Sequence, residues 1–231
     1  MSEAEQKTET PEANPARSGE MIRALVGVAA VSGILISVVF QWTLPAIKAN
    51  RAEALQKAVF AVIPGVKTVV TFEVTQEGKL VALTEDKVAE EKMYAGYDQQ
   101  GQLAGVALEA QGQGYQDVIK ILYGYNPEKE HVVGINILDS KETPGLGDKI
   151  GKDPKFLANF EALDVRLKED RSGAVHPLEV VKQGTKSKAW QIDSITGATI
   201  SSKAVGKILN ASVPQRLPVV QKNLDTLKEK P

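Results

Sequence analysis

Residues 103–138 read LAGVALEAQGQGYQDVIKILYGYNPEKEHVVGINIL, and this stretch decides the fold. Three apolar runs of strand length lie at 103–110, 118–125 and 131–138, separated by a glycine-rich segment and by Asn126-Pro127. Runs of this kind with short turns between them are typical of consecutive antiparallel strands. The stretch therefore predicts the centre of an antiparallel sheet.

The rest of the chain adds strands before this stretch and helices after it. Downstream, apolar residues recur at the three- and four-residue spacing of helices. The sequence thus predicts one α+β domain over residues 66–231, a mainly antiparallel sheet with flanking helices. The further strands are expected at 66–74, 80–83, 92–97 and 178–181, and the helices at 154–163, at 201–211 and around Leu224.

The N-terminal part has the pattern of a membrane anchor. Residues 1–20 are polar and predict a disordered tail, because they cannot bury enough apolar surface to offset their ordering entropy. No residue between Arg23 and Lys48 is charged, which predicts one transmembrane helix over 21–45, followed by a stalk helix over 46–65. A cleaved signal peptide or a buried helix is the alternative, although a signal h-region is shorter. Positive charges are balanced on the two sides, so the charge rule leaves the orientation open.

Composition excludes several classes of function. The 231 residues carry a net charge of −1 without a run of Lys or Arg, so nothing indicates a nucleic-acid partner. The absence of cysteine excludes disulfides, thiolate metal sites and iron–sulfur ligation. With only His131 and His176, zinc chemistry and a serine–histidine triad are poorly supplied, and we expect neither a metal site nor a catalytic residue.

A first candidate site is the loop 142–148, Glu-Thr-Pro-Gly-Leu-Gly-Asp, which follows a predicted strand. Gly145 and Gly147 allow the backbone to approach a flat ligand closely, with Leu146 as an apolar contact. A plain connecting loop is the alternative interpretation.

A second candidate site is the segment 193–202, Asp-Ser-Ile-Thr-Gly-Ala-Thr-Ile-Ser-Ser, directly before a predicted helix. Small hydroxylated residues favour a helix start, and the unpaired N–H groups of a helix start bind phosphate. Gly197 and Ala198 leave room for such a group. A helix cap without a ligand is the alternative. The chain has neither Gly-Lys-Ser/Thr nor Gly-x-Gly-x-x-Gly, which argues against a nucleotide bound in either of those modes.

The two segments together resemble the FMN-binding domain family. Asp-x-x-Thr-Gly-Ala-Thr, ending at Thr199, is similar to the family's flavinylation motif, and Glu-Thr-Pro-Gly-Leu-Gly-Asp-Lys-Ile, beginning at Glu142, is similar to a second hallmark. Gly114-Tyr115, Gly124, Gly134-Ile135 and Ile137 precede the Glu142 loop in the family's order, and one membrane span precedes the domain. The whole chain beyond the polar tail resembles the G subunits of Rnf electron-transport complexes.

The resemblance implies a covalent cofactor. A flavin transferase would move FMN from FAD onto the hydroxyl of Thr199 through a phosphoester bond, and Asp193 would be the acidic residue that the transferase requires. Position 196 holds Thr where many members have Ser. The implied cofactor-binding residues besides Thr199 are Ser194, Thr196, Gly197, Ala198, Glu142, Thr143, Leu146 and Gly147.

The resemblance also implies a function. The chain would carry electrons within a complex that links ferredoxin and NAD to ion movement, with no independent catalysis. It would be a single-pass protein of the cell inner membrane, in contact with lipid and the other Rnf subunits, with its FMN domain on the periplasmic side. The alternatives are the C subunit of the sodium-pumping NADH:quinone oxidoreductase and a non-redox, membrane-anchored assembly module.

Overall fold

The computed structural model describes residues 15–75, 77–83 and 91–230. The chain divides into two compact units between Ala52 and Glu53. Most of the predicted polar tail lies outside the described residues.

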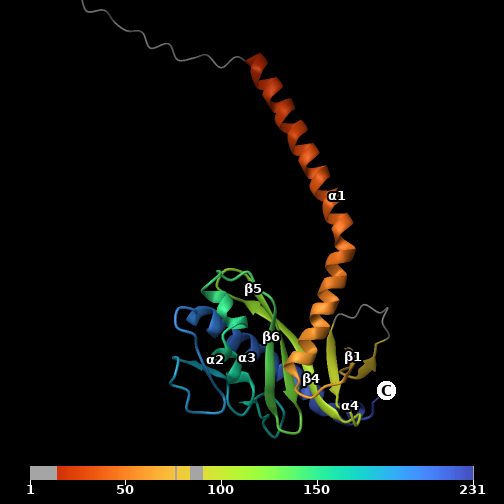
Figure 1. The fold of residues 1–231 in the computed structure, drawn as a ribbon, viewed down its shortest axis with the longest axis vertical. Coiled ribbons are helices and arrows are strands. Elements are labelled where there is room, and N and C mark those ends of the chain that lie inside the picture. The colour runs from red at the N-terminus through yellow and green to blue at the C-terminus, as the bar shows by residue number, and fades with distance from the viewer. Residues whose placement is uncertain (1–14, 76, 84–90, 231) are drawn as a thin grey trace, which may run out of the picture. The chain divides into compact units, whose positions relative to one another are not determined.

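A single helix, α1 (Pro15–Val62), runs through both the predicted span and the predicted stalk (Figure 1). Its apolar part is long enough to cross a membrane, and the side chains there are exposed. Pro45 lies inside the helix without ending it, and the last positions of the predicted tail, 15–20, are helical. The helix ends just before Pro64-Gly65, where Gly65 has a φ of +81°, as its turn signal predicts.

The domain is built on a seven-stranded antiparallel sheet in the order β2-β1-β3-β4-β5-β6-β7. The strand pairs from β3 to β6 follow one another along the chain, as expected for runs joined by short turns. The strands are β1 (Thr68–Val74), β2 (Leu80–Ala82), β3 (Lys92–Tyr97), β4 (Leu103–Gln113), β5 (Val118–Asn126), β6 (His131–Asp139) and β7 (Leu163–Asp164).

The predicted α+β class and the central strands are confirmed, whereas some details differ from the sequence prediction. The helix expected over 154–163 is only α2 (Pro154–Leu157) followed by a 3-10 turn, η2 (Ala158–Phe160). The amide of Asn159 donates to the carbonyls of Phe156 and Asp193, which ties this turn to a distant strand in place of a further helical turn. A short parallel pair, β8 (Glu179–Val181) and β9 (Gln191–Asp193), was only half predicted.

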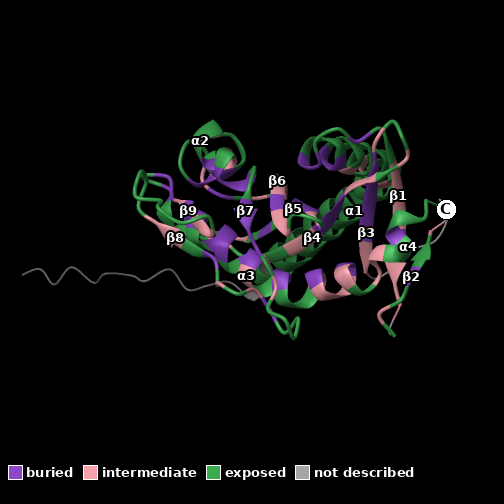
Figure 2. Cartoon of the chain, turned by 90° about the horizontal axis from the view of Figure 1, so that it is seen from below, coloured by how far each residue is buried: buried purple, intermediate pink, exposed green. Residues whose placement is uncertain are grey.

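The helix α3 (Thr199–Lys222) packs on one face of the sheet and is longer than the predicted 201–211. It continues through Pro214 and Pro218 and is followed by the short helix α4 (Leu224–Lys228). Figure 2 shows buried residues on α3 and on the central strands. Between the end of β6 and α2 lies a second 3-10 turn, η1 (Gly147–Gly151).

The last turns of α1 pack on the opposite face of the sheet. Val59, Val62 and Ile63 are buried there in one cluster with Leu122. A Cβ on Gly134 would lie 2.6 Å from the carbonyl oxygen of Val62, so glycine at this position lets the helix end touch the strand.

Candidate functional site

The structure brings the two candidate segments together around one cavity of about 370 Å³. One wall is the loop after β6, and the other is the first turn of α3, 59 positions further along the chain. This volume lies in the range of small-molecule sites. The lining residues are Tyr115, Glu142, Thr143, Leu146, Gly147, Gly197, Ala198, Thr199, Ile200 and Ser201.

Glu142 holds the parts of this cavity together. Its side chain is 5% exposed. One carboxylate oxygen, Oε2, accepts the hydroxyl hydrogen of Ser201 on α3. The other, Oε1, accepts the N–H groups of Tyr115 at 2.8 Å and Gln116 at 3.1 Å, in the turn between β4 and β5. A single buried carboxylate therefore fixes the distance between three segments of the chain.

Because Gly147 has no side chain, the loop can pass close to the carboxylate of Glu142. A Cβ at Gly147 would lie 2.6 Å from Oε2 of Glu142 and 2.7 Å from Oγ of Ser201, closer than real Cβ atoms come to their neighbours. The sequence predicted a glycine for close approach to a ligand. The structure shows that the close approach is to Glu142 and Ser201.

The start of α3 is open to an anion. The N-cap residue is Ala198, whose side chain provides no capping hydrogen bond, and Thr199 is the first helical residue. The first N–H groups of a helix have no partner within the helix, and the helix dipole favours negative charge there. Gly197, with a φ of +86°, makes the turn that leads into the helix. Thr199 is exposed, and its hydroxyl has only a long contact, 3.4 Å, to the carbonyl of Ile195.

The other predicted residues of the motif do not line this cavity. The carboxylate of Asp193 accepts the N–H groups of Thr185 and Lys186 in the turn after β8. The hydroxyl of Thr196 donates to the side chain of Gln183. Ser194 is buried beside a smaller hollow of about 190 Å³ behind the motif. The structure therefore divides the motif into a cavity side and a rear side.

The rim of the cavity is apolar and exposed. Tyr115 is 62% exposed, Leu146 is 50% exposed and Ile200 is 58% exposed. Of these three residues, only Leu146 was predicted from the sequence as a flavin contact. Exposed apolar groups gathered at a polar cavity are typical of a surface that another group covers.

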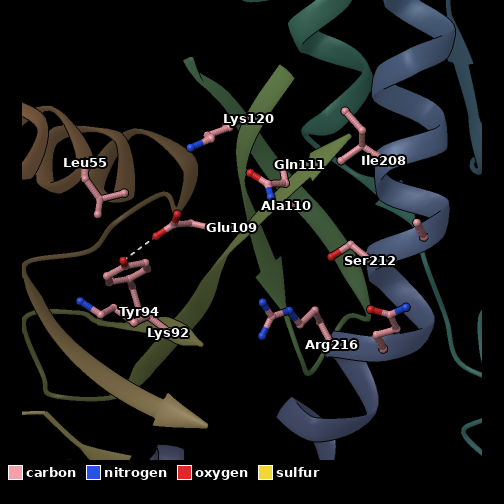
Figure 3. Close-up of a pocket in the computed structure, with 12 residues that line it drawn as sticks. Leu55, Lys92, Tyr94, Glu109, Ala110, Gln111, Lys120, Ile208, Ser212 and Arg216 are labelled. Carbon is pink, nitrogen blue, oxygen red and sulfur yellow. Dashed lines mark hydrogen bonds between the residues drawn. The ribbon is translucent and has the colours of Figure 1, made fainter. Parts of the chain in front are cut away.

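A second and larger cavity, of about 560 Å³, lies between β4 and α3 (Figure 3). The hydroxyl of Tyr94 donates to Glu109 at 2.6 Å, and Arg216 forms an ion pair with Glu91. Burial and the hydrogen bond to Glu109 raise the pKa of Tyr94 above its ordinary value, so this phenol stays protonated. None of the residues predicted as site residues lines this cavity.

Among the residues that the structure describes, no three His, Cys, Asp or Glu side chains form a group that could hold a metal ion. The cavity between the two motif segments contains one carboxylate and three hydroxyl side chains besides Tyr115. It offers hydrogen bonds and an anion site at the helix start, and its carboxylate accepts the hydroxyl hydrogen of Ser201.

Comparison with known proteins gives a consistent result. Residues 114–213, which contain both segments, match the family model described as the FMN-binding domain. The G subunit of the ion-translocating oxidoreductase complex of Methanosarcina acetivorans is 29% identical over 197 residues, which cover 84% of this chain and 92% of that one. The protein of the same name from Shewanella oneidensis is 30% identical over 182 residues, 78% of this chain and 80% of that one. The crystal structure of Shewanella oneidensis NqrC shares the fold, with a TM-score of 0.54 and 19% identity over 72% of this chain and 86% of that one.

Proposed function

The chain belongs to the family of G subunits of ion-translocating oxidoreductase complexes, and from this premise we propose that it carries electrons within such a complex through an FMN attached to Thr199. The observation that carries the proposal is the meeting of both motif segments at one cavity with an open helix start. In this proposal the complex transfers electrons between ferredoxin and NAD, as the name of the Clostridium ljungdahlii relative states for that protein.

The residues at the cavity fit the cofactor. A phosphate group suits the uncapped first turn of α3, because its negative charge meets free N–H groups and the helix dipole. The exposed apolar rim of Tyr115, Leu146 and Ile200 suits a flat aromatic ring. When bound, FMN supplies one- and two-electron chemistry that these side chains lack.

The chain's own contribution to attachment is the hydroxyl of Thr199. Its Oγ would bond to the FMN phosphorus of FAD, the bond from that phosphorus to the bridging oxygen would break, and AMP would leave with the hydroxyl proton passed to it or to water. A flavin transferase would catalyse this exchange. Thr199 is exposed at the cavity, so the acceptor is accessible to another protein.

In the assembled complex, α1 would anchor the domain as a single membrane span. Its apolar part is exposed in the chain by itself, which suits contact with lipid and with the other membrane subunits. We assign residues 21–45 to the span, 46–65 to the stalk, whose last turns pack on the sheet, and 66–231 to the FMN domain, which would lie on the periplasmic side of the inner membrane. We expect no turnover by the chain alone, because the site provides binding groups only.

Coexpression with a flavin transferase tests the proposal. The full chain should be fluorescent under ultraviolet light on a denaturing gel, because a phosphoester survives denaturation. Thr199→Val should abolish this fluorescence after overnight coexpression, whereas Thr196→Val, the matched control in the same motif, should keep it. A colourless wild-type band, or fluorescence that persists in Thr199→Val, would refute covalent attachment at this residue.

Two other functions remain as alternatives with less support. A C subunit of a sodium-pumping NADH:quinone oxidoreductase shares the fold, but the relatives that match most of the chain are named as G subunits of ion-translocating complexes. A non-redox assembly module would not explain why the helix start at the cavity lacks a side-chain cap or why the cavity has an exposed apolar rim. The colourless result above would favour the module.

A further inference from the structure

A short turn lies behind the motif on the side away from the cavity. It is the first part of the loop 182–190 that connects the parallel strands β8 and β9, and Asp193, the last residue of β9, accepts hydrogen bonds from it. One carboxylate oxygen of Asp193 accepts the N–H groups of Thr185 at 3.1 Å and Lys186 at 3.0 Å. The carboxylate of Asp193, the acidic residue of the motif, therefore stabilises a turn of the domain itself.

This turn presents Gln183 to the middle of the motif. The side-chain oxygen of Gln183 accepts the hydroxyl hydrogen of Thr196 at 2.7 Å and the N–H of the same residue at 3.2 Å. Both contacts use the oxygen of the amide, so Gln183 acts as an acceptor only. Thr196 is thereby held on the rear side of the motif, three positions before the exposed Thr199.

The beginning of the motif is held separately by Asn159. Its side-chain oxygen accepts the N–H of Asp193 at 2.9 Å, and its amide donates to the carbonyl of Asp193 at 3.2 Å. Asn159 is 5% exposed, so this contact is part of the core. Between this buried anchor and the start of α3, the hydroxyl oxygen of Ser202 accepts the N–H of Ile195 at 3.1 Å, and Gln183 makes both side-chain contacts to Thr196 in the exposed turn.

We propose that Gln183, held in place by the turn that Asp193 organises, is a positioning residue for flavin attachment. It fixes the exposed turn of the motif so that, of the two threonines in the motif, Thr199 presents its hydroxyl at the cavity and Thr196 donates its hydroxyl hydrogen to Gln183. This inference rests on the proposed function, since it concerns the efficiency of the same attachment. It gives Asp193 a role inside the fold, whereas recognition of Asp193 by the transferase stays a prediction.

The test uses the full chain in detergent with purified flavin transferase and FAD, and follows the initial rate of flavin incorporation by in-gel fluorescence. Gln183→Met removes the acceptor and should slow incorporation about tenfold at saturating transferase, with little change in the KM for the chain. A tenfold change corresponds to about 1.4 kcal/mol, a reasonable value for two lost hydrogen bonds. Gln183→Glu keeps an acceptor oxygen and should stay within about twofold of the wild type.

Two further variants separate positioning from loss of structure. Gln191→Met is the matched control, because Gln191 bonds to Ser187, Lys188 and Glu179 around the same turn without touching the motif. It should leave the rate unchanged. Thr196→Val removes only the hydroxyl bond and should slow incorporation less than Gln183→Met, by about threefold, because the N–H of residue 196 can still donate to Gln183. The double variant should be no slower than Gln183→Met alone, because both changes remove the same contact.

A flavin-free measurement completes the test. Amide hydrogen exchange at residues 194–198 should be faster in Gln183→Met than in the wild type before any flavin is added, with a melting temperature lower by no more than roughly 3–6 °C. The proposal would be overturned if Gln183→Met incorporated flavin at the wild-type rate, or if Gln183→Met and Gln183→Glu slowed incorporation equally. In either case, a wild-type chain that becomes labelled would still support attachment at Thr199. An unlabelled wild type would instead refute the attachment itself, and the positioning role with it.

Discussion

Replacing Glu142 by alanine should remove three hydrogen bonds that connect the walls of the cavity. The buried hydroxyl of Ser201, which is 3% exposed, would lose its acceptor, at a cost of about 1–3 kcal/mol. The N–H groups of Tyr115 and Gln116 belong to exposed residues and would bond to water, so each loses about 0.5–1.5 kcal/mol. The sum is about 2–6 kcal/mol, or a melting temperature lower by roughly 4–24 °C.

Thermal unfolding of the detergent-solubilised chain, followed by near-ultraviolet circular dichroism, measures this effect. Glu142→Gln keeps one oxygen for both N–H groups and should cost about 1 kcal/mol. Glu109→Ala is the control, because it removes one hydrogen bond, from Tyr94, and should also cost about 1 kcal/mol. A Glu142→Ala chain that melts within about 2 °C of the wild type would refute the view that this carboxylate holds the site together.

Three other predictions follow from the same contacts. Gly147→Ala should destabilise the domain by about 1–3 kcal/mol in the same melting assay, because its Cβ would lie 2.7 Å from Oγ of Ser201; an unchanged melt would contradict this. Leu146→Ala should shift the absorption and potential of the attached flavin without lowering flavin content, and unchanged values of both would place the ring elsewhere. Burial raises the pKa of Asp164, but hydrogen bonds from Arg166 outweigh it and hold that pKa below its ordinary value. The folded pKa is therefore lower than the unfolded one, so the stability from this pair should be present above about pH 4 and lost as the pH falls further. In Asp164→Asn, the free energy of unfolding should fall less steeply as the pH drops below about 4 than in the wild type. An unchanged pH dependence would refute a stabilising role for the ion pair between Asp164 and Arg166.

The sequence predicted those parts of the fold that depend on local pattern. The runs at 92–97, 103–110, 118–125 and 131–138 became strands β3 to β6 with nearly the same bounds, because alternating apolar residues between turns have few other ways to be buried. Both motif segments were also found, since their glycines and hydroxyl residues are dense and close in sequence. Local pattern therefore predicted the sheet and made both segments candidate sites, whereas the family resemblance singled them out as walls of one cofactor site.

The sequence did not predict the contacts that hold those walls in place. Glu142 reaches Ser201 across 59 positions and Tyr115 across 27, and Thr196 reaches Gln183 across 13. Such pairs depend on how the elements pack, and a single sequence carries no periodic signal for them. Glu142 was named as a flavin contact, whereas its observed bonds are all to other parts of the chain.

Helix lengths were also underestimated where proline interrupts the pattern. Pro45 lies within α1, and Pro214 and Pro218 lie within α3. Proline removes one helical hydrogen bond and strains the turn before it, so a proline in the sequence usually predicts the end of a helix. On α3 the buried residues Val213, Leu217 and Val220 compensate by packing against the sheet.

The final turns of α1 have a consequence for how the domain can be released from its anchor. Ala58, Val59, Val62 and Ile63 are buried against the sheet, so they belong to the folded body. A protease that cuts the exposed helix before Glu53 would release a unit with its core complete. A cut at Pro64-Gly65, the visible turn between helix and strands, would instead remove one wall of that core and leave an insoluble fragment. The sequence position that looks like a linker is thus the wrong place to separate anchor from domain.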